Sequence, residues 1–160
     1  MSKLHQIVQD PHWYLHAINL DEAKLYFVKT NAAILSAASF LDQRFDVRGS
    51  QTASLGLQEV LNYIDSPEAA PSGIPQFIFH TAFCCSTLMA RCIDLPSSNV
   101  SLKEPAVLMA LANYKRTGHR RLSNRVEAGK IFHLVNHLLF RPFGDGQSVV
   151  VKPTNTVNNI

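Results

Sequence analysis

The stretch from Gln76 to Asp94 constrains the fold more than any other part of the sequence. It opens with Phe77-Ile78-Phe79, an apolar run of strand-forming residues without alternation, which is typical of a strand covered on both faces in a parallel sheet. Residues 80–87 then read as a loop that leads into a helix. In an open parallel sheet, ligands bind beyond the carboxyl ends of the strands, where backbone N–H groups favour anions. The stretch therefore predicts a strand, a phosphate-cradling loop and a helix.

Two further apolar runs, at residues 100–102 and 148–151, predict two more parallel strands. The helical pattern between them predicts one helix that begins at Pro105 and a longer one over residues 125–140. Strand, helix, strand, helices, strand is the rhythm of a three-layer α/β domain, a P-loop-type parallel sheet flanked by helices. Such sheets usually have about five strands, so we expect the sheet to be incomplete and to continue beyond Ile160.

The N-terminal part has a different pattern. Apolar and polar residues alternate around a polar turn in residues 13–29, which predicts a small β-hairpin. Helices are predicted over residues 32–41 and 57–64, and a loop with three prolines follows at residues 66–75. We therefore expect two parts: residues 1–66, a hairpin and helices packed on the domain, and residues 76–160, the parallel-sheet domain.

Composition excludes several classes of protein. A hydrophobic content of 46% with 17% charged residues excludes a disordered tail, and no apolar run approaches the length of a membrane span. The N-terminus lacks the pattern of a secretory signal, so a cytoplasmic location is expected. A net charge of +3 suits an anionic ligand but not nucleic acid. The one dense basic cluster, His119-Arg120-Arg121, is interpreted as a solvated turn or as a contact for a phosphate or polyanion.

Cysteines and histidines do not indicate a metal site. Cys84, Cys85 and Cys92 lack the spacing of a disulfide framework or a zinc site, so we expect them to be reduced and mostly buried. His133 and His137 are the one histidine pair spaced as i and i+4, but nothing in the sequence nominates a third ligand. Both are expected to flank the hydrophobic stripe of their helix, and no metal is predicted.

The loop departs from the Walker motif of nucleotide triphosphatases. His80 and Cys85 occupy its glycine positions, Ser86 stands at the lysine, and Thr87 at the hydroxyl residue. Without that lysine, ordinary hydrolysis of ATP or GTP is not expected. Two interpretations stay open on the residues alone: a divergent nucleotide kinase or ATPase that uses Lys103 or Lys152 instead, and an interaction module with a degenerate loop.

Three segments carry a resemblance to a known family. They are F-I-F-H-T-A-F-C-C-S-T-L-M-A-R at residues 77–91, Lys103-Glu104-Pro105, and V-V-V-K-P-T-N at residues 149–155. Together they resemble the N-terminal portion of bacterial sulfotransferase-like proteins of the P-loop nucleoside triphosphate hydrolase superfamily. Residues 10–13, 26–28 and 40–42 are similar to the opening of the same group.

The resemblance implies a donor, a reaction and an acceptor class. The donor is 3′-phosphoadenosine 5′-phosphosulfate (PAPS), from which a sulfuryl group passes in line to a hydroxyl or amine of a small-molecule or carbohydrate acceptor. No metal, nucleic acid or membrane partner is implied. Because segments that hold the 3′-phosphate follow later in this family, the chain alone is expected to be inactive. An incomplete sheet also predicts homo-oligomers through an exposed edge.

The resemblance also assigns roles to residues of the loop. Ser86 and Thr87 would bind the phosphosulfate oxygens, and the backbone N–H groups from Phe83 through Cys84 and Cys85 would complete the cradle. Leu88 would start the packed face of the following helix.

Sulfotransferase loops commonly carry a basic residue and a glycine at the places of residues 83–85, so another cation is needed here. Arg91 and His80 are candidates, and Lys103 and Lys152 are the better two because each ends a predicted strand at the edge of the loop. Glu104 would accept the acceptor's proton. The alternative for Lys103 and Glu104 is a surface ion pair ahead of a helix.

Overall fold

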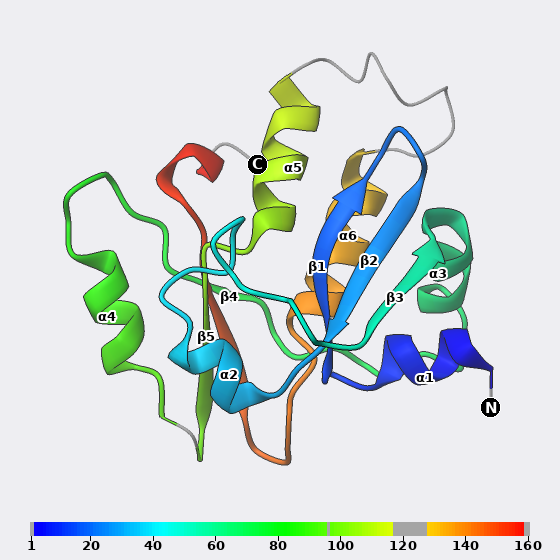
Figure 1. Cartoon of the computed structure of the whole chain (residues 1–160), viewed down its shortest axis with the longest axis horizontal. Coiled ribbons are helices and arrows are strands. Elements are labelled where there is room, and N and C mark those ends of the chain that lie inside the picture. Colours follow the sequence, from blue (N-terminus) through cyan, green and yellow to red (C-terminus); the bar gives the residue numbers. More distant parts are fainter. Residues whose placement is uncertain (1, 96, 117–127, 159–160) are drawn as a thin grey trace.

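The computed structural model describes residues 2–95, 97–116 and 128–158 of the chain, which form an α/β structure with two separate three-stranded sheets (Figure 1). In chain order the elements are α1 (Lys3–Gln9), β1 (Trp13–Asn19), β2 (Lys24–Lys29), α2 (Ala32–Ala37), β3 (Thr52–Gly56), α3 (Leu57–Ile64), β4 (Gln76–Phe77), α4 (Ser86–Cys92), β5 (Asn99–Lys103), α5 (Ala106–Arg116), α6 (Ala128–Leu139), β6 (Ser148–Lys152) and the 3₁₀ turn η1 (Asn155–Val157).

The first sheet is antiparallel, with strand order β1-β2-β3. The predicted hairpin over residues 13–29 is confirmed, since β1 pairs with β2 from Trp13 opposite Lys29. The sequence interpretation missed β3, which pairs with β2 through residues 52–56. Its polar and apolar side chains alternate only weakly, because Ala53 is small and Leu55 is the one buried residue of the strand, so the signal for a strand is short and faint.

The second sheet is parallel, with strand order β4-β6-β5. The three predicted parallel strands are confirmed, and the last of them in the chain lies between the other two. Strand β4 is shorter than expected: it ends at Phe77, and Phe79 is 61% exposed. The prediction that residues 77–79 are covered on both faces is therefore wrong at Phe79. Within the described strands β4 pairs with β6 alone, so it is an edge strand.

One continuous hydrophobic core joins the two sheets, with buried residues from β1, β2, β5, β6, α3, α5 and α6. Helices α5 and α6 contact β1, and α3 packs on α6. The N-terminal elements thus share a core with the parallel-sheet part. Helix α4 lies at one end of the molecule against β5 and β6 (Figure 1), and it contributes no residue to this core.

Two helix boundaries differ from the predictions. Helix α2 ends at Ala37 rather than Leu41, because the backbone N–H of Leu41 turns to donate to the carbonyl of Lys103 at 2.7 Å. The expected start of the longer helix at residue 125 lies outside the described residues, and α6 is described from Ala128 to Leu139. Helix α3 spans residues 57–64 as predicted.

The buried side chain of Arg141 joins the end of α6 to the N-terminus of the chain. Its guanidinium donates to the carbonyls of Leu138, Ile7, Val8, Asp10 and Trp13 at 2.6–3.1 Å. Burial lowers its pKa to about 10, so Arg141 remains charged at neutral pH. The guanidinium thus satisfies backbone carbonyls at the ends of α1 and α6 that have no partner within their own helix.

Within residues 2–95, 97–116 and 128–158, no helix is long and apolar enough to cross a bilayer.

Candidate functional site

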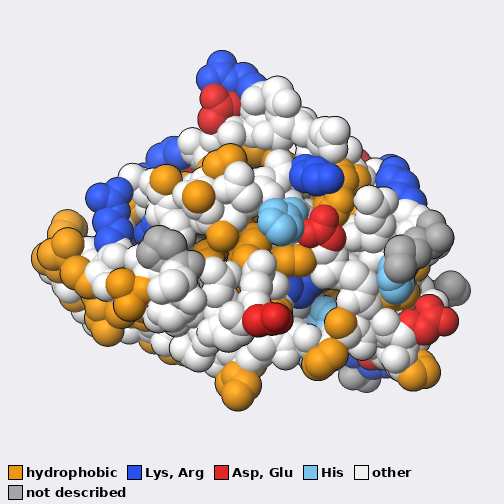
Figure 2. All heavy atoms as spheres, turned by 90° about the horizontal axis from the view of Figure 1, so that it is seen from below, with side chains coloured by type: hydrophobic (Ala, Val, Ile, Leu, Met, Phe, Trp, Pro, Cys, Tyr) orange, Lys and Arg blue, Asp and Glu red, His pale blue; other side chains and the backbone are white. Residues whose placement is uncertain are grey.

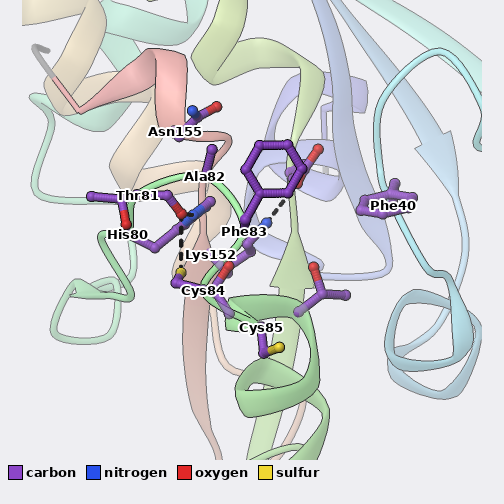
Figure 3. A pocket seen from close by; sticks show the side chains of 12 residues that line it. Phe40, His80, Thr81, Ala82, Phe83, Cys84, Cys85, Lys152 and Asn155 are labelled. Carbon is purple, nitrogen blue, oxygen red and sulfur yellow. Dashed lines mark hydrogen bonds and ion pairs between the residues drawn. The ribbon is translucent and has the colours of Figure 1, made fainter.

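A cavity of about 300 Å³ opens at the carboxyl ends of the parallel strands (Figure 3). Its lining comes from segments far apart in the chain: Phe40, all eight residues of the loop 80–87, Glu104, Lys152 and Asn155. The loop follows β4, Glu104 follows β5, and Lys152 ends β6. This is the position at which open parallel sheets bind ligands.

The loop has an unusual backbone. Phe83 and Cys85 have φ angles of 58° and 57°, in the left-handed region that favours glycine. Non-glycine residues hold such a conformation at a cost of about 1–3 kcal/mol, and residues of this kind cluster at active sites and ligand clamps. The loop therefore keeps a turn that glycine usually makes, although its residues there are phenylalanine and cysteine. The Phe83 ring is fully exposed at the mouth of the cavity.

Hydrogen bonds fasten this loop to the segment that follows β6. The His80 ring has Nε2 at 2.8 Å from the carbonyl oxygen of Pro153 and Nδ1 at 2.8 Å from that of Thr81. The side-chain amide of Asn158 donates to the carbonyl of His80 at 2.8 Å. The His80 ring thus lies between the carbonyl of Thr81 in the loop and that of Pro153 after β6.

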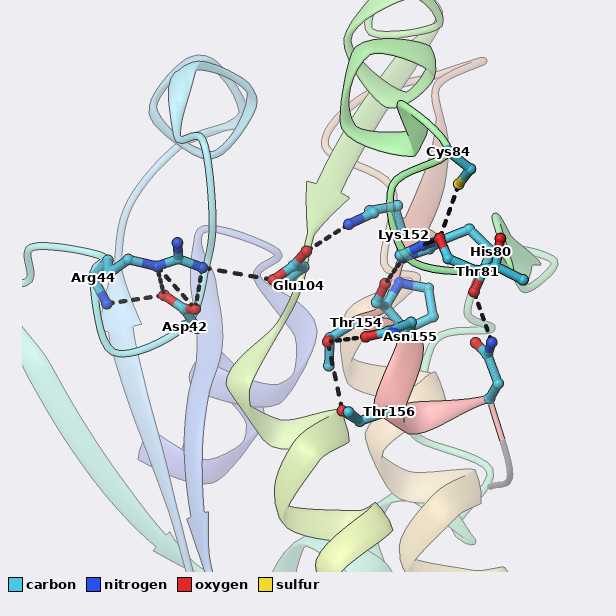
Figure 4. Close-up of polar contacts among 12 residues, drawn as sticks. Asp42, Arg44, His80, Thr81, Cys84, Glu104, Lys152, Thr154, Asn155 and Thr156 are labelled. Atoms are coloured by element: carbon cyan, nitrogen blue, oxygen red, sulfur yellow. Dashed lines mark hydrogen bonds and ion pairs between the residues drawn. The ribbon is translucent and has the colours of Figure 1, made fainter.

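Lys152 and Glu104 form an ion pair in the floor of the cavity (Figure 4). The Lys152 ammonium donates to Glu104 Oε1 at 2.5 Å, and Lys152 is 1% exposed. Glu104 holds a φ of 55°, a third left-handed residue at this site. The structure thus brings together the predicted residues Ser86, Thr87, Glu104 and Lys152.

Lys103 does not reach the cavity. It pairs with Lys152 across β5 and β6, but its ammonium is buried and donates to the carbonyls of Ser36 at 2.7 Å and Ser101 at 3.2 Å. Asp94 Oδ2 lies 3.3 Å from it. Burial lowers the pKa of Lys103, and the charge of Asp94 opposes that effect. Lys103 holds α2 against β5, so of the two favoured cations Lys152 alone lines the cavity.

Sequence reasoning missed the wall opposite the loop. Phe40 lines the cavity, and the guanidinium of Arg44 lies over its ring, 3.7 Å from the centroid. Asp42 accepts three hydrogen bonds from the Arg44 guanidinium, and these lower the pKa of Asp42. Residues 40–42 belong to a segment quoted for the resemblance, but no local pattern places them beside residue 104.

The three cysteines are exposed, so the prediction that they are buried is wrong. The adjacent pair lies in the loop, whose turn displays its side chains to solvent. Cys84 donates to the carbonyl of Thr81 at 3.0 Å. Desolvation raises the pKa of this thiol, but hydrogen bonds with Ser86 and Thr81 outweigh it, so the pKa lies below its usual value.

Leu88 also lies on the opposite side of its helix from the one predicted. It is 63% exposed, and the expectation that it starts the packed face of α4 is wrong. The helix turns Ser86 and Ala90 toward the sheet instead. These two are small residues spaced as i and i+4, which lets α4 lie close to the strands.

Among residues 2–95, 97–116 and 128–158, no group of three His, Cys, Asp or Glu side chains is placed to hold a metal ion. His137 is buried and His133 is exposed, so the pair does not converge on one site. The basic cluster at residues 119–121 lies outside the described residues.

Comparison with known proteins identifies no relative. No protein-family model, curated protein or solved structure matches the chain. The resemblance to sulfotransferases stays a prediction, and the functional proposal rests on the cavity.

Proposed function

We propose that this cavity is the donor site of a sulfotransferase-like P-loop protein that binds PAPS. The supporting observation is the lining of one cavity: the left-handed loop 80–87, the hydroxyls of Ser86 and Thr87, and the Lys152 ammonium meet at the carboxyl ends of parallel strands. Hydroxyl and N–H donors with one cation suit a phosphosulfate group. Its sulfuryl group passes to a hydroxyl or amine of a small-molecule or carbohydrate acceptor.

The reaction needs charge stabilisation and one base. As the acceptor oxygen or nitrogen bonds to sulfur, the bond from sulfur to the bridging oxygen breaks, and that oxygen leaves with the electron pair on the 5′-phosphate. Lys152 stabilises the charge that develops there. Glu104 takes the proton that the acceptor loses. Positioning and electrostatics supply most of the rate in such transfers.

Binding of adenosine 3′,5′-bisphosphate, the product that the donor leaves, tests the proposal. Calorimetric titration of the chain is expected to give saturable binding that Lys152→Met weakens about tenfold or more, because a charge-assisted contact is lost. Lys130→Met is the matched control, since Lys130 is exposed on α6. Absence of binding to the unmodified chain, or an equal loss in both variants, would contradict the proposal.

A nucleotide kinase or ATPase is the second candidate, because Lys152 stands in the cavity where that chemistry needs a cation for phosphates. Titration with ATP in the presence and absence of Mg²⁺ separates the two. Binding of ATP that requires magnesium, without binding of the bisphosphate, favours the kinase.

An interaction module is the third candidate, favoured by hydrophobic side chains exposed near α4. Phe79, Leu88 and Met89 are 56–63% exposed, and Figure 2 shows hydrophobic side chains at the end of the molecule where α4 lies. The unpaired edge of β4 is close in sequence, which is the edge through which we expect homo-oligomers. Light scattering tests association, and biological activity that survives replacement of Ser86 and Thr87 by alanine supports this candidate.

A further inference from the structure

The carboxylate of Glu104 lies between two cations that come from different parts of the chain (Figure 4). Its Oε1 accepts from Lys152 Nζ at 2.5 Å, and its Oε2 is 3.6 Å from Arg44 Nη2. Lys152 is buried beneath the cavity, whereas the side chain of Arg44 is 58% exposed at the rim. Glu104 therefore has a tight partner and a looser one.

Arg44 is held in reach of Glu104 by its own surroundings. Backbone hydrogen bonds tie Leu41 to the β5 end, from Leu41 N–H to the Lys103 carbonyl at 2.7 Å and from Ala106 N–H to the Leu41 carbonyl at 3.1 Å. Asp42 and the ring of Phe40 then orient the guanidinium. This segment thus places the Arg44 guanidinium beside Glu104, the carboxylate that pairs with Lys152.

An anion that enters the cavity meets Lys152 already paired. If Glu104 stayed in place, its negative charge would repel the anion. If Glu104 moved away from Lys152 without a new partner, a carboxylate with 18% side-chain exposure would be left without a cation, which is unfavourable. Arg44 removes this conflict because it lies on the side of Glu104 away from Lys152 (Figure 4).

We infer that Glu104 is an exchangeable counter-ion: it pairs with Lys152 in the empty cavity and shifts to Arg44 when an anion takes Lys152. Arg44 is then a positioning residue that acts on the ligand through Glu104. This inference rests on the proposed anion site, and it adds that a carboxylate of the chain itself occupies the cation of that site until an anion replaces it.

A double-mutant cycle tests the exchange, with inorganic pyrophosphate as the probe and adenosine 3′,5′-bisphosphate in parallel. Glu104→Gln is expected to tighten pyrophosphate binding about tenfold, since Lys152 no longer has to leave a charged partner. Arg44→Met is expected to weaken binding about threefold where Glu104 is present, the size typical of an exposed pair. In the Glu104→Gln background, Arg44→Met is expected to change nothing. Arg44→Lys, which keeps the charge, is expected to restore binding.

Several results would overturn the inference. Equal weakening by Arg44→Met in both backgrounds would mean that Arg44 binds the anion directly, and no weakening in either would mean that it takes no part. If Glu104→Gln bound pyrophosphate equally well or more weakly, the Glu104 carboxylate would not compete with the anion for Lys152. Should this variant not fold, Glu104→Asp replaces it. Its shorter carboxylate is expected to weaken both contacts, so Arg44→Met is expected to have a smaller effect in that background than in the unmodified chain. If the chain binds pyrophosphate but not adenosine 3′,5′-bisphosphate, the proposal that the cavity binds PAPS is refuted, whereas the exchange of Glu104 is still tested by pyrophosphate.

Discussion

Replacement of His137 by leucine is expected to reduce the loss of stability that the fold suffers between pH 7.5 and pH 5.0. His137 lies in α6 with 9% of its surface exposed, and it lines a cavity of about 130 Å³ together with Arg141. Burial, then the charge of Arg141 and that of His133, lower its pKa from 6.5 to about 4. His137 therefore binds a proton less readily in the folded protein than in the unfolded chain.

The sign and size of the effect follow from linkage. At pH 7.5 and above, His137 is mostly neutral in both states, and this group has little effect on stability. As pH falls from 6.5 toward 4, the unfolded state binds the proton first, so the free energy of unfolding decreases. At about 1.4 kcal/mol per pH unit, the ceiling between pH 7.5 and pH 5.0 is about 2 kcal/mol. Partial access of solvent to the ring reduces the expected loss to about 1 kcal/mol.

Urea unfolding at pH 7.5 and pH 5.0 measures this difference. Trp13 is the one tryptophan of the sequence and is 8% exposed, so its fluorescence reports unfolding. Between the two pH values, the free energy of unfolding of the His137→Leu variant is expected to fall by about 1 kcal/mol less than that of the unmodified chain. His133→Leu, at an exposed position one turn earlier, is the comparison variant, and it is expected to change the pH dependence less than His137→Leu does, because it removes the smallest of the three causes that lower the His137 pKa. The same pH dependence in the His137→Leu variant and the unmodified chain would refute the reasoning.

Three further predictions concern other parts of the fold. Arg141→Met is expected to lower the free energy of unfolding by about 3–5 kcal/mol, because five carbonyls lose a buried donor; a loss under 1 kcal/mol in urea titration would contradict this. Gly73→Ala is expected to lower the free energy of unfolding by about 1–3 kcal/mol, since a Cβ there would lie 2.7 Å from the carbonyl oxygen of Phe140. Gly49→Ala is the comparison: Gly49 has a left-handed backbone and nothing within 4 Å of an added Cβ, so this variant measures the cost of the backbone conformation without a clash. Cys84 is expected to react faster with iodoacetamide at pH 7.5 than Cys92 by mass spectrometry, because its pKa is lowered; equal rates would argue against a stabilised thiolate.

The fold was predictable where hydrophobic periodicity is strong. Helix α3 and the strand at residues 148–151 carry continuous or amphipathic apolar patterns, and both were placed correctly. Strand β3 was missed because pairing with β2, not its own composition, makes it a strand. Helix α4 was placed but its buried face was not, since close packing there favours Ser86 and Ala90 over the larger Leu88.

The candidate site was predictable only in part. The positions of Glu104 and Lys152 follow from the rule that parallel strands end at one edge. The rule does not tell on which face of the sheet the side chain of the last residue lies. Lys103 was therefore expected at the cavity, but its side chain is buried in the interior. Arg44 was missed because its place depends on hydrogen bonds between residues far apart in the sequence.

The central position of β6 has a consequence for how the protein is made. Among the described strands, β4 and β5 do not pair with each other; each pairs with β6, which comes after both in the sequence. Roughly 70 residues separate Phe77 from Ser148, and at 5–20 residues per second the ribosome needs several seconds to add them. During that interval β4, and β5 once it is made, lack the partner that each has in the parallel sheet, and residues 80–87 have neither Lys152 nor the Pro153 carbonyl to hold them. The cavity is thus a late product of synthesis, and a nascent chain that pauses before residue 148 presents unpaired strands to the chaperones around it.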